Sequence, residues 1–221
     1  LELLQWLVQE EQGFAMDEKV MQSAVLGGNL QVVQWLRGEG CEWDEETCSN
    51  AAGSGHLKVL QWLRGEGCPW NWKTITAATF QGHLEVVRWA HENGCDWNFT
   101  ACAGAAMADK LEVLQWLRAE GCPWNGVTCH FAVDKGHVET LRWARENGCD
   151  WDAKACECAA QRGDLEVLQW LRTNGCPWDA ETCNSAAENG HLETLRWAHQ
   201  GHVEVLRWAR ENGCEWDIQT R

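Results

Sequence analysis

The chain has 221 residues, 18 Lys+Arg against 33 Asp+Glu, a net charge of −15, and 17 tryptophans but no tyrosine. Its apolar fraction of 45% is enough for a buried core, which excludes intrinsic disorder. No apolar run is long enough to span a membrane, and the first residues lack the basic region of a secretory signal, so we expect no membrane insertion. Because phosphate binding needs clustered Lys and Arg, the negative charge argues against a nucleic-acid partner.

A single short sequence recurs along the chain. The dipeptide that opens each leucine-rich stretch returns with a period of 27, as from His56-Leu57 to His83-Leu84. A period of about 20 to 50 residues is typical of a solenoid, in which every unit buries its apolar face against the next. We therefore expect one array over residues 1–221, regular from about residue 13 to residue 200, with both ends interrupting a unit. The tryptophan step falls from 27 to 11 between Trp197 and Trp208, which predicts a shortened unit around 198–203.

Each unit predicts two helices and almost no strand. The second helix spans Leu84–Glu92 in its repeat and stops at Gly94, which suits a left-handed C-terminal position. The first helix is expected to end at a glycine such as Gly55, Gly82 or Gly190. It begins after an Asp or Asn, which are preferred N-cap residues. These are Asp44, Asn71, Asn98, Asn125, Asp152 and Asp179.

The segment Ala186-Ala187-Glu188-Asn189-Gly190-His191-Leu192-Glu193 resembles the centre of an ankyrin repeat. The resemblance covers about nine-tenths of the chain and implies an all-α solenoid of stacked helix-turn-helix units. The period is 27 instead of about 33, and the repeat lacks the positions that form the β-hairpin of ankyrin repeats. The family signature is reduced to Thr182-Cys183, and a tryptophan stands where ankyrin repeats usually have leucine. Ankyrin arrays share no active site, so the resemblance implies no catalysis.

Two rows of tryptophan follow the repeat, and both are predicted to be buried between units, because large side chains at a fixed phase suit stacking. The row in the second helices comprises Trp35, Trp62, Trp89, Trp116, Trp143, Trp170, Trp197 and Trp208. The row in the loops comprises Trp43, Trp70, Trp97, Trp124, Trp151, Trp178 and Trp216.

The 13 cysteines also form two rows, with Cys158 outside both. Neighbours within a row should be about 8–10 Å apart, beyond the reach of a disulfide, so we expect free thiols that serve as small apolar side chains. Only Cys156 and Cys158 are as close as two residues, and no second pair at ligand spacing accompanies them, so we predict no metal. Free thiols favour a reducing intracellular compartment, the cytoplasm by default.

A column of histidines, including His56 and His191, is expected to cap the second helices. Asn29, Lys110 and Asp164 occupy the same column in other units, which a catalytic or metal-binding role would not tolerate. No nucleophile motif or phosphate-binding loop occurs. The sequence therefore predicts neither an enzyme nor a cofactor.

Three columns of the first helices vary freely from unit to unit. They are four residues apart and share one helix face, which stacking should align into a strip. In the middle of the strip, large apolar residues form a cluster that is suited to anchor a partner. The candidate contacts are Trp72, Thr76, Phe80, Phe99, Ala103, Met107 and His130.

The sequence therefore predicts a non-enzymatic module that binds a protein partner along this variable face. The net charge favours a basic or mixed partner segment. The alternative is a structural spacer subunit of a large assembly, bound through its ends or its other face.

Overall fold

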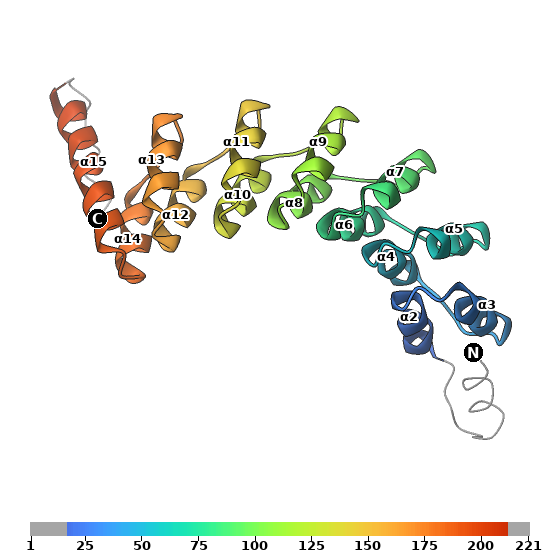
Figure 1. Cartoon of the computed structure of the whole chain (residues 1–221). Helices are drawn as coiled ribbons and strands as arrows, with labels where there is room; N and C mark the ends of the chain where they lie inside the picture. The colour runs from blue at the N-terminus through green and yellow to red at the C-terminus, as the bar shows by residue number, and fades with distance from the viewer. Residues whose placement is uncertain (1–16, 212–221) are drawn as a thin grey trace. The chain divides into compact units, whose positions relative to one another are not determined.

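A computed structural model describes residues 17–211 of the chain, with side chains described as far as residue 201. This part consists of helices joined by short loops, without any strand, so the predicted all-α solenoid of helix pairs is confirmed (Figure 1). The predictions for His202, Trp208, Cys214 and Trp216 lie outside the described side chains. The helices are α2 (Glu18–Leu26), α3 (Leu30–Gly38), α4 (Glu45–Gly53), α5 (Leu57–Gly65), α6 (Trp72–Gln81), α7 (Leu84–Glu92), α8 (Phe99–Met107), α9 (Leu111–Ala119), α10 (Gly126–Lys135), α11 (Val138–Glu146), α12 (Ala153–Arg162), α13 (Leu165–Thr173), α14 (Ala180–Glu188) and α15 (Leu192–Glu211).

The helices fall into two compact units, Leu1–Trp124 and Asn125–Arg221. In the first unit the first helices of the repeats, α2, α4, α6 and α8, pack against one another in chain order. In the second unit α10, α12 and α14 do the same. Each first helix from α2 to α12 also packs against the second helix of its own repeat. The first helices therefore make the main contacts between successive repeats. Their outward faces form a continuous surface within each unit.

The predicted N-caps are confirmed. Asn71 Oδ1 accepts the backbone N–H of Lys73 at 2.9 Å, and Asn98 Oδ1 accepts that of Thr100 at 2.9 Å. Such bonds satisfy an amide that has no partner within the helix. Gly94 has the predicted left-handed conformation, with φ +80°.

The C-terminal ends of the first helices are only partly as predicted. α6 ends at its cap Gly82, but α4 and α14 end at Gly53 and Glu188, before the glycines expected to stop them. In these two helices the cap residue keeps a negative φ, and the left-handed turn falls on the glycine that follows.

The tryptophans of the two rows are half-buried wherever the structure describes their side chains, which corrects the prediction that they form the core. Most of the fully buried side chains are Leu, Val, Ala and Cys, such as Leu60 and Leu114. These residues set a close spacing between helices that leaves no room for an indole, so the tryptophans lie at the edge. There Trp43, Trp70, Trp97 and Trp151 of the loop row each pack edge-on against a helix tryptophan, as Trp70 does with Trp89 at 5.9 Å. The guanidinium of Arg64 covers the other part of the same ring, 4.2 Å from Trp70.

The cysteines that follow the second helices are hydrogen-bond donors as well as small side chains. Cys95 Sγ donates to the carbonyl oxygen of Asn71 at 3.3 Å, and Cys149 Sγ donates to that of Asn125 at 3.3 Å. These acceptors are the N-cap residues of the first helices that precede them, so the thiols join the two ends of a repeat. The twelve cysteines that the structure describes are free thiols, and all except Cys183 are buried.

The prediction that histidines cap their own helices is wrong for His56 and His191. His56 Nε2 lies 2.9 Å from the carbonyl oxygen of Leu26, and His191 Nε2 lies 3.0 Å from that of Gln161. Neither makes a side-chain bond to its own helix in the described contacts, whereas Asn29, in the same column, does cap its helix. The longer imidazole reaches across to the preceding repeat, which the shorter Asn side chain does not.

The shortened unit is one continuous helix. α15 runs from Leu192 to Glu211 without a break at residues 198–203. Within these residues no first helix or loop separates the two second-helix sequences.

Candidate functional site

The candidate contacts lie on three first helices. The members on α6 and α8 belong to the first unit, whereas His130 lies on α10 in the second unit. Within the first unit, each residue on α8 follows its counterpart on α6 by one repeat period. These six residues are Trp72, Thr76, Phe80, Phe99, Ala103 and Met107.

Three of these side chains are exposed although they are large and apolar. The exposed fractions of Trp72, Phe80 and Phe99 are 38%, 40% and 40%. Met107 is half-buried, and Ala103 is only 3% exposed, so Ala103 belongs to the packing and offers no contact surface. We call Trp72, Phe80, Phe99 and Met107 the apolar cluster. Its exposure sets it apart from the tryptophans at the edges of the repeats, which are covered by neighbouring rings and guanidinium groups.

Small residues and hydroxyl groups hold α6 close to α8 beneath the apolar cluster. Thr76 Oγ1 lies 3.0 Å from Thr100 Oγ1, so one hydroxyl donates to the other across the two helices. A Cβ placed on Gly104 would lie 3.5 Å from Thr79 Oγ1, which shows how closely the helices approach. The side chains of the apolar cluster therefore stand on a closely packed base.

A groove of about 500 Å³ lies between α4 and α6, on the side of α6 that carries Trp72 and Phe80. Gly53 and Ala77 form its floor, and a Cβ placed on Gly53 would lie 3.3 Å from the Cβ of Ala77. Gly53 lies in the variable column that holds Leu26 one repeat before it and Phe80 one repeat after it. The missing side chain at Gly53 thus leaves a notch between two large apolar residues.

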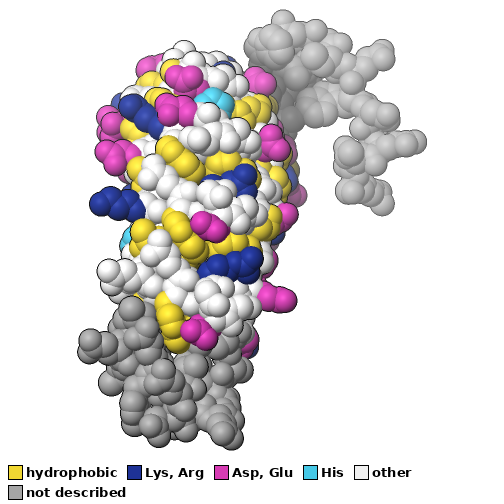
Figure 2. All heavy atoms as spheres, turned by 90° about the vertical axis from the view of Figure 1, so that its right-hand side faces the viewer, with side chains coloured by type: hydrophobic (Ala, Val, Ile, Leu, Met, Phe, Trp, Pro, Cys, Tyr) yellow, Lys and Arg dark blue, Asp and Glu magenta, His cyan; other side chains and the backbone are white. Residues whose placement is uncertain are grey.

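Figure 2 presents one face of the molecule, seen from the right-hand side of Figure 1. Hydrophobic side chains reach that face in separate patches, with Lys and Arg side chains between them and acidic side chains around them. A partner that covers such a face meets both apolar and charged groups. Its recognition would therefore combine apolar contact with charge.

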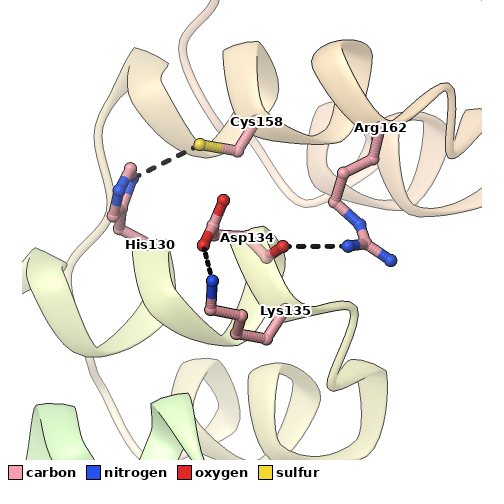
Figure 3. A network of polar contacts seen from close by, with 5 residues as sticks. All are labelled: His130, Asp134, Lys135, Cys158 and Arg162. Atoms are coloured by element: carbon pink, nitrogen blue, oxygen red, sulfur yellow. Dashed lines mark hydrogen bonds and ion pairs between the residues drawn. The ribbon is translucent and has the colours of Figure 1, made fainter.

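His130 belongs to a network of polar contacts between α10 and α12, which Figure 3 shows. His130 Nδ1 lies 3.6 Å from Cys158 Sγ. Arg162 Nη1 donates to the carbonyl oxygen of Asp134 at 2.9 Å, and Lys135 Nζ lies 2.8 Å from the Asp134 carboxylate. The Lys135 ammonium lowers the pKa of the Asp134 carboxyl, and burial raises the pKa of the Cys158 thiol to about 11. A thiol with that pKa stays protonated at neutral pH, so this network is structural rather than nucleophilic.

The members of this network are the counterparts of groove residues in the first unit. Each follows its counterpart by three repeat periods. His130 and Asp134 take the places of Ser49 and Gly53, and Cys158 takes that of Ala77. The volume that stays open between α4 and α6 is therefore occupied by side chains between α10 and α12.

Comparison with known proteins identifies the repeats. A search of the curated proteins found no match to the sequence. The crystal structure of the human ASB11 ankyrin repeat domain is similar, with a TM-score of 0.56 and 16% identity, over 71% of this chain and 84% of that chain. Residues 129–172 match the family model described as ankyrin repeats (many copies). Residues 129–172 are thus similar to ankyrin repeats, and the likeness to the solved structure shows the ankyrin-repeat fold. Ankyrin repeats generally mediate protein–protein interaction, and the fold is typically a non-enzymatic interaction module.

Two further properties of the described residues bear on the class of this protein. Among the side chains that the structure describes, no group of three or more His, Cys, Asp and Glu is placed to hold a metal ion. Of the described helices, none combines the length and the apolar character needed to cross a membrane.

Leu26, Gly53 and Lys73 also belong to the site, although the sequence did not mark them as candidate contacts. Gly53 is a member of a variable column, but a glycine carries no side chain to suggest a role. Following that column of the repeats back by one period leads to Leu26, which is 52% exposed. The repeat register therefore identifies Leu26, Gly53 and Phe80 as members of one column. The notch itself depends on how α2, α4 and α6 are stacked.

Proposed function

We propose that this protein binds a protein partner through the apolar cluster on α6 and α8, as a non-catalytic interaction module. The observation that carries the proposal is the exposure of Trp72, Phe80 and Phe99 on one face, above a base that is otherwise fully packed. Large aromatic side chains are the residues that contribute most to binding when a partner covers them. Covering the exposed part of one such side chain, about 60–100 Å², contributes about 1.5–2.5 kcal/mol by area alone.

The face is also placed for binding within its unit. The first helices carry the packing from repeat to repeat, so α4, α6 and α8 present their outer positions on a rigid support. Rigid presentation lowers the entropy that is lost when a partner binds. The free thiols of the interior, eleven of them buried, support a reducing intracellular compartment as the place of action.

A differential pull-down from native lysate tests this proposal. Phe99→Asp and Trp72→Asp each place a charge in the apolar cluster, and Ala153→Asp, in the same variable column on α12, is the matched control. We expect a partner that is retained by the wild type and by Ala153→Asp, and lost by both cluster variants. Circular dichroism and cooperative melting establish that each variant is folded.

The result that contradicts the proposal is a partner retained equally by all four proteins. The binding surface would then lie outside the apolar cluster. The spacer function, in which contacts are made through the ends or another face, would be the better account.

A further inference from the structure

The groove between α4 and α6 has a chemical character that the net charge of the chain does not suggest. Only one of its lining residues is charged, and that residue is Lys73. No ion pair joins Lys73 to another residue within the described part of the chain. On α4, Glu46 is the counterpart of Lys73, and Glu45 accepts a hydrogen bond from Asn71 Nδ2. Neither glutamate lines the groove. The one charged side chain that lines the groove is therefore a cation, although the protein carries −15.

The apolar part of the groove lies at its opposite end. Phe80 and Leu26 flank the notch over Gly53, and both side chains are exposed, at 40% and 52%. Phe80 lies two helical turns beyond Lys73 on α6, which places the two about 10 Å apart along the helix axis. The groove thus offers a cation and an apolar notch at a fixed separation.

Polar side chains between these two ends favour an extended ligand over a helical one. Asn50, Ser54 and Gln81 line the groove, and among the described contacts their side chains make no hydrogen bond. An extended peptide has backbone N–H and C=O groups that need partners, whereas a helix has satisfied its own. An extended chain in the polyproline II conformation advances about 3.1 Å per residue with three residues per turn. A side chain three residues along therefore lies about 9 Å away on the same face, close to the separation of Lys73 and the notch.

We propose that the groove between α4 and α6 binds an extended acidic segment of the partner. A carboxylate of the segment pairs with Lys73, and a large apolar side chain three residues away enters the notch over Gly53. This inference rests on the proposed function and specifies the partner's chemistry. It replaces the basic or mixed segment that the net charge favours, because the lining of the groove is what a bound segment touches.

The repeat register of the chain supplies the controls. Lys154 on α12 is the counterpart of Lys73 three repeats later, so Lys154→Glu makes the same charge change outside the groove. Gly53→Leu would fill the notch, but the new side chain would also press on Ala77, and this variant could fail to fold. Phe80→Gln removes one wall of the notch and uses the residue that α12 has at that position, Gln161.

A phage-displayed library of random linear dodecapeptides, panned against the wild-type protein, tests the proposal. We expect enriched peptides in which Asp or Glu and a large apolar residue are separated by two positions. Fluorescence anisotropy with one such peptide should show at least a tenfold loss of affinity for Lys73→Glu and for Phe80→Gln, and no loss for Lys154→Glu. Replacing the acidic residue of the peptide by Lys should restore binding to Lys73→Glu.

Three results overturn the inference. One is the absence of any enriched peptide, and another is an enriched set that lacks acidic residues. The third is a peptide that binds Lys73→Glu and Phe80→Gln as tightly as the wild type. In that third case, binding of the peptide to Phe99→Asp tests the proposed function separately. Loss of binding would keep the apolar cluster as the binding site, whereas unchanged binding would contradict both the inference and the proposed function.

Discussion

Helices α6 and α12 are built on the same plan and present different surfaces. Each has an Asn or Asp N-cap, ten residues and a left-handed glycine at its end, Gly82 or Gly163. On α6 the variable positions hold Trp72 and Phe80, which rise beside the open groove. On α12 the same positions hold Ala153 and Gln161, and side chains fill the corresponding space toward α10 (Figure 3). The residues that all repeats share therefore determine the backbone. A few variable positions within each repeat determine whether the space between neighbouring first helices is open or filled.

The largest effect should come from the core that both units share. Leu60 on α5 and its counterpart Leu141 on α11 are fully buried, so Leu60→Ala and Leu141→Ala should each lower the free energy of unfolding by about 2–5 kcal/mol. Trp72→Ala should lower it by about 1 kcal/mol or less, because that ring is exposed. Urea denaturation of the three variants measures this. Equal losses for all three would mean that Trp72 belongs to the core.

The next effect concerns the surface of α6 alone. The double variant Trp72→Ala, Phe80→Gln gives α6 the residues of α12 at its two outer positions. Partner affinity should fall by about 100-fold, which corresponds to about 2.7 kcal/mol, with melting almost unchanged. Titration calorimetry with the partner recovered from the pull-down measures the loss. A double variant that binds as tightly as the wild type would make the difference between the two helices irrelevant to function.

The pH dependence of stability should distinguish the filled space between α10 and α12 from the open groove between α4 and α6. Burial raises the pKa of Cys158 to about 11 from an ordinary 9.0, and its counterpart in the first unit is Ala77. The stability that comes from the neutral thiol is complete below about pH 9 and is lost between pH 9 and 11, as the unfolded chain ionises first. The slope in that window is about 1.4 kcal/mol per pH unit for one thiol.

Thermal melting of the wild type and Cys158→Ala at several pH values checks this effect. The variant should lose less stability between pH 9 and 11 than the wild type does. The chain has no tyrosine, so phenol ionisation adds nothing in this range. Parallel curves for the two proteins would show that the Cys158 thiol is not buried as described.

The smallest effect should separate two residues at the ends of these helices. Arg162 donates to the Asp134 carbonyl oxygen, whereas its counterpart Gln81 lines the groove. Arg162→Ala should lower the free energy of unfolding by about 0.5 kcal/mol, because the bond is exposed, and Gln81→Ala should leave it unchanged. Chemical denaturation with replicate curves measures both. A larger loss of unfolding free energy for Gln81→Ala than for Arg162→Ala would contradict the assignment of an open groove between α4 and α6 and a filled space between α10 and α12.

The parts of the fold that follow local rules were predictable from the sequence. The N-cap at Asn71 and the left-handed Gly94 depend on residues within one turn of helix, so the repeat displays them directly. The burial of tryptophan was not predictable, because it depends on the spacing that Leu, Ala and Cys side chains impose between helices. The bond from His56 to Leu26 joins two successive repeats, and no helix-capping rule contains it.

The candidate site was predictable in its residues and not in its shape. The variable columns identified Trp72, Phe80 and Phe99, which are exposed as a binding surface requires. The groove depends on Gly53 lying between Leu26 and Phe80 in space, and only the stacking of α2, α4 and α6 produces that arrangement. Leu26, Gly53 and Phe80 occupy one variable column. Considering them as neighbours in space would have suggested the notch over Gly53.

Hydroxyl-radical footprinting with and without the partner tests the central claim most directly, since it measures the exposure of individual side chains. In the free protein Trp72, Phe80 and Phe99 should be oxidised faster than the half-buried Phe131. Addition of the partner should protect these three and leave Phe131 unchanged. Protection confined to residues outside α4, α6 and α8, with Trp72, Phe80 and Phe99 oxidised as before, would contradict the account.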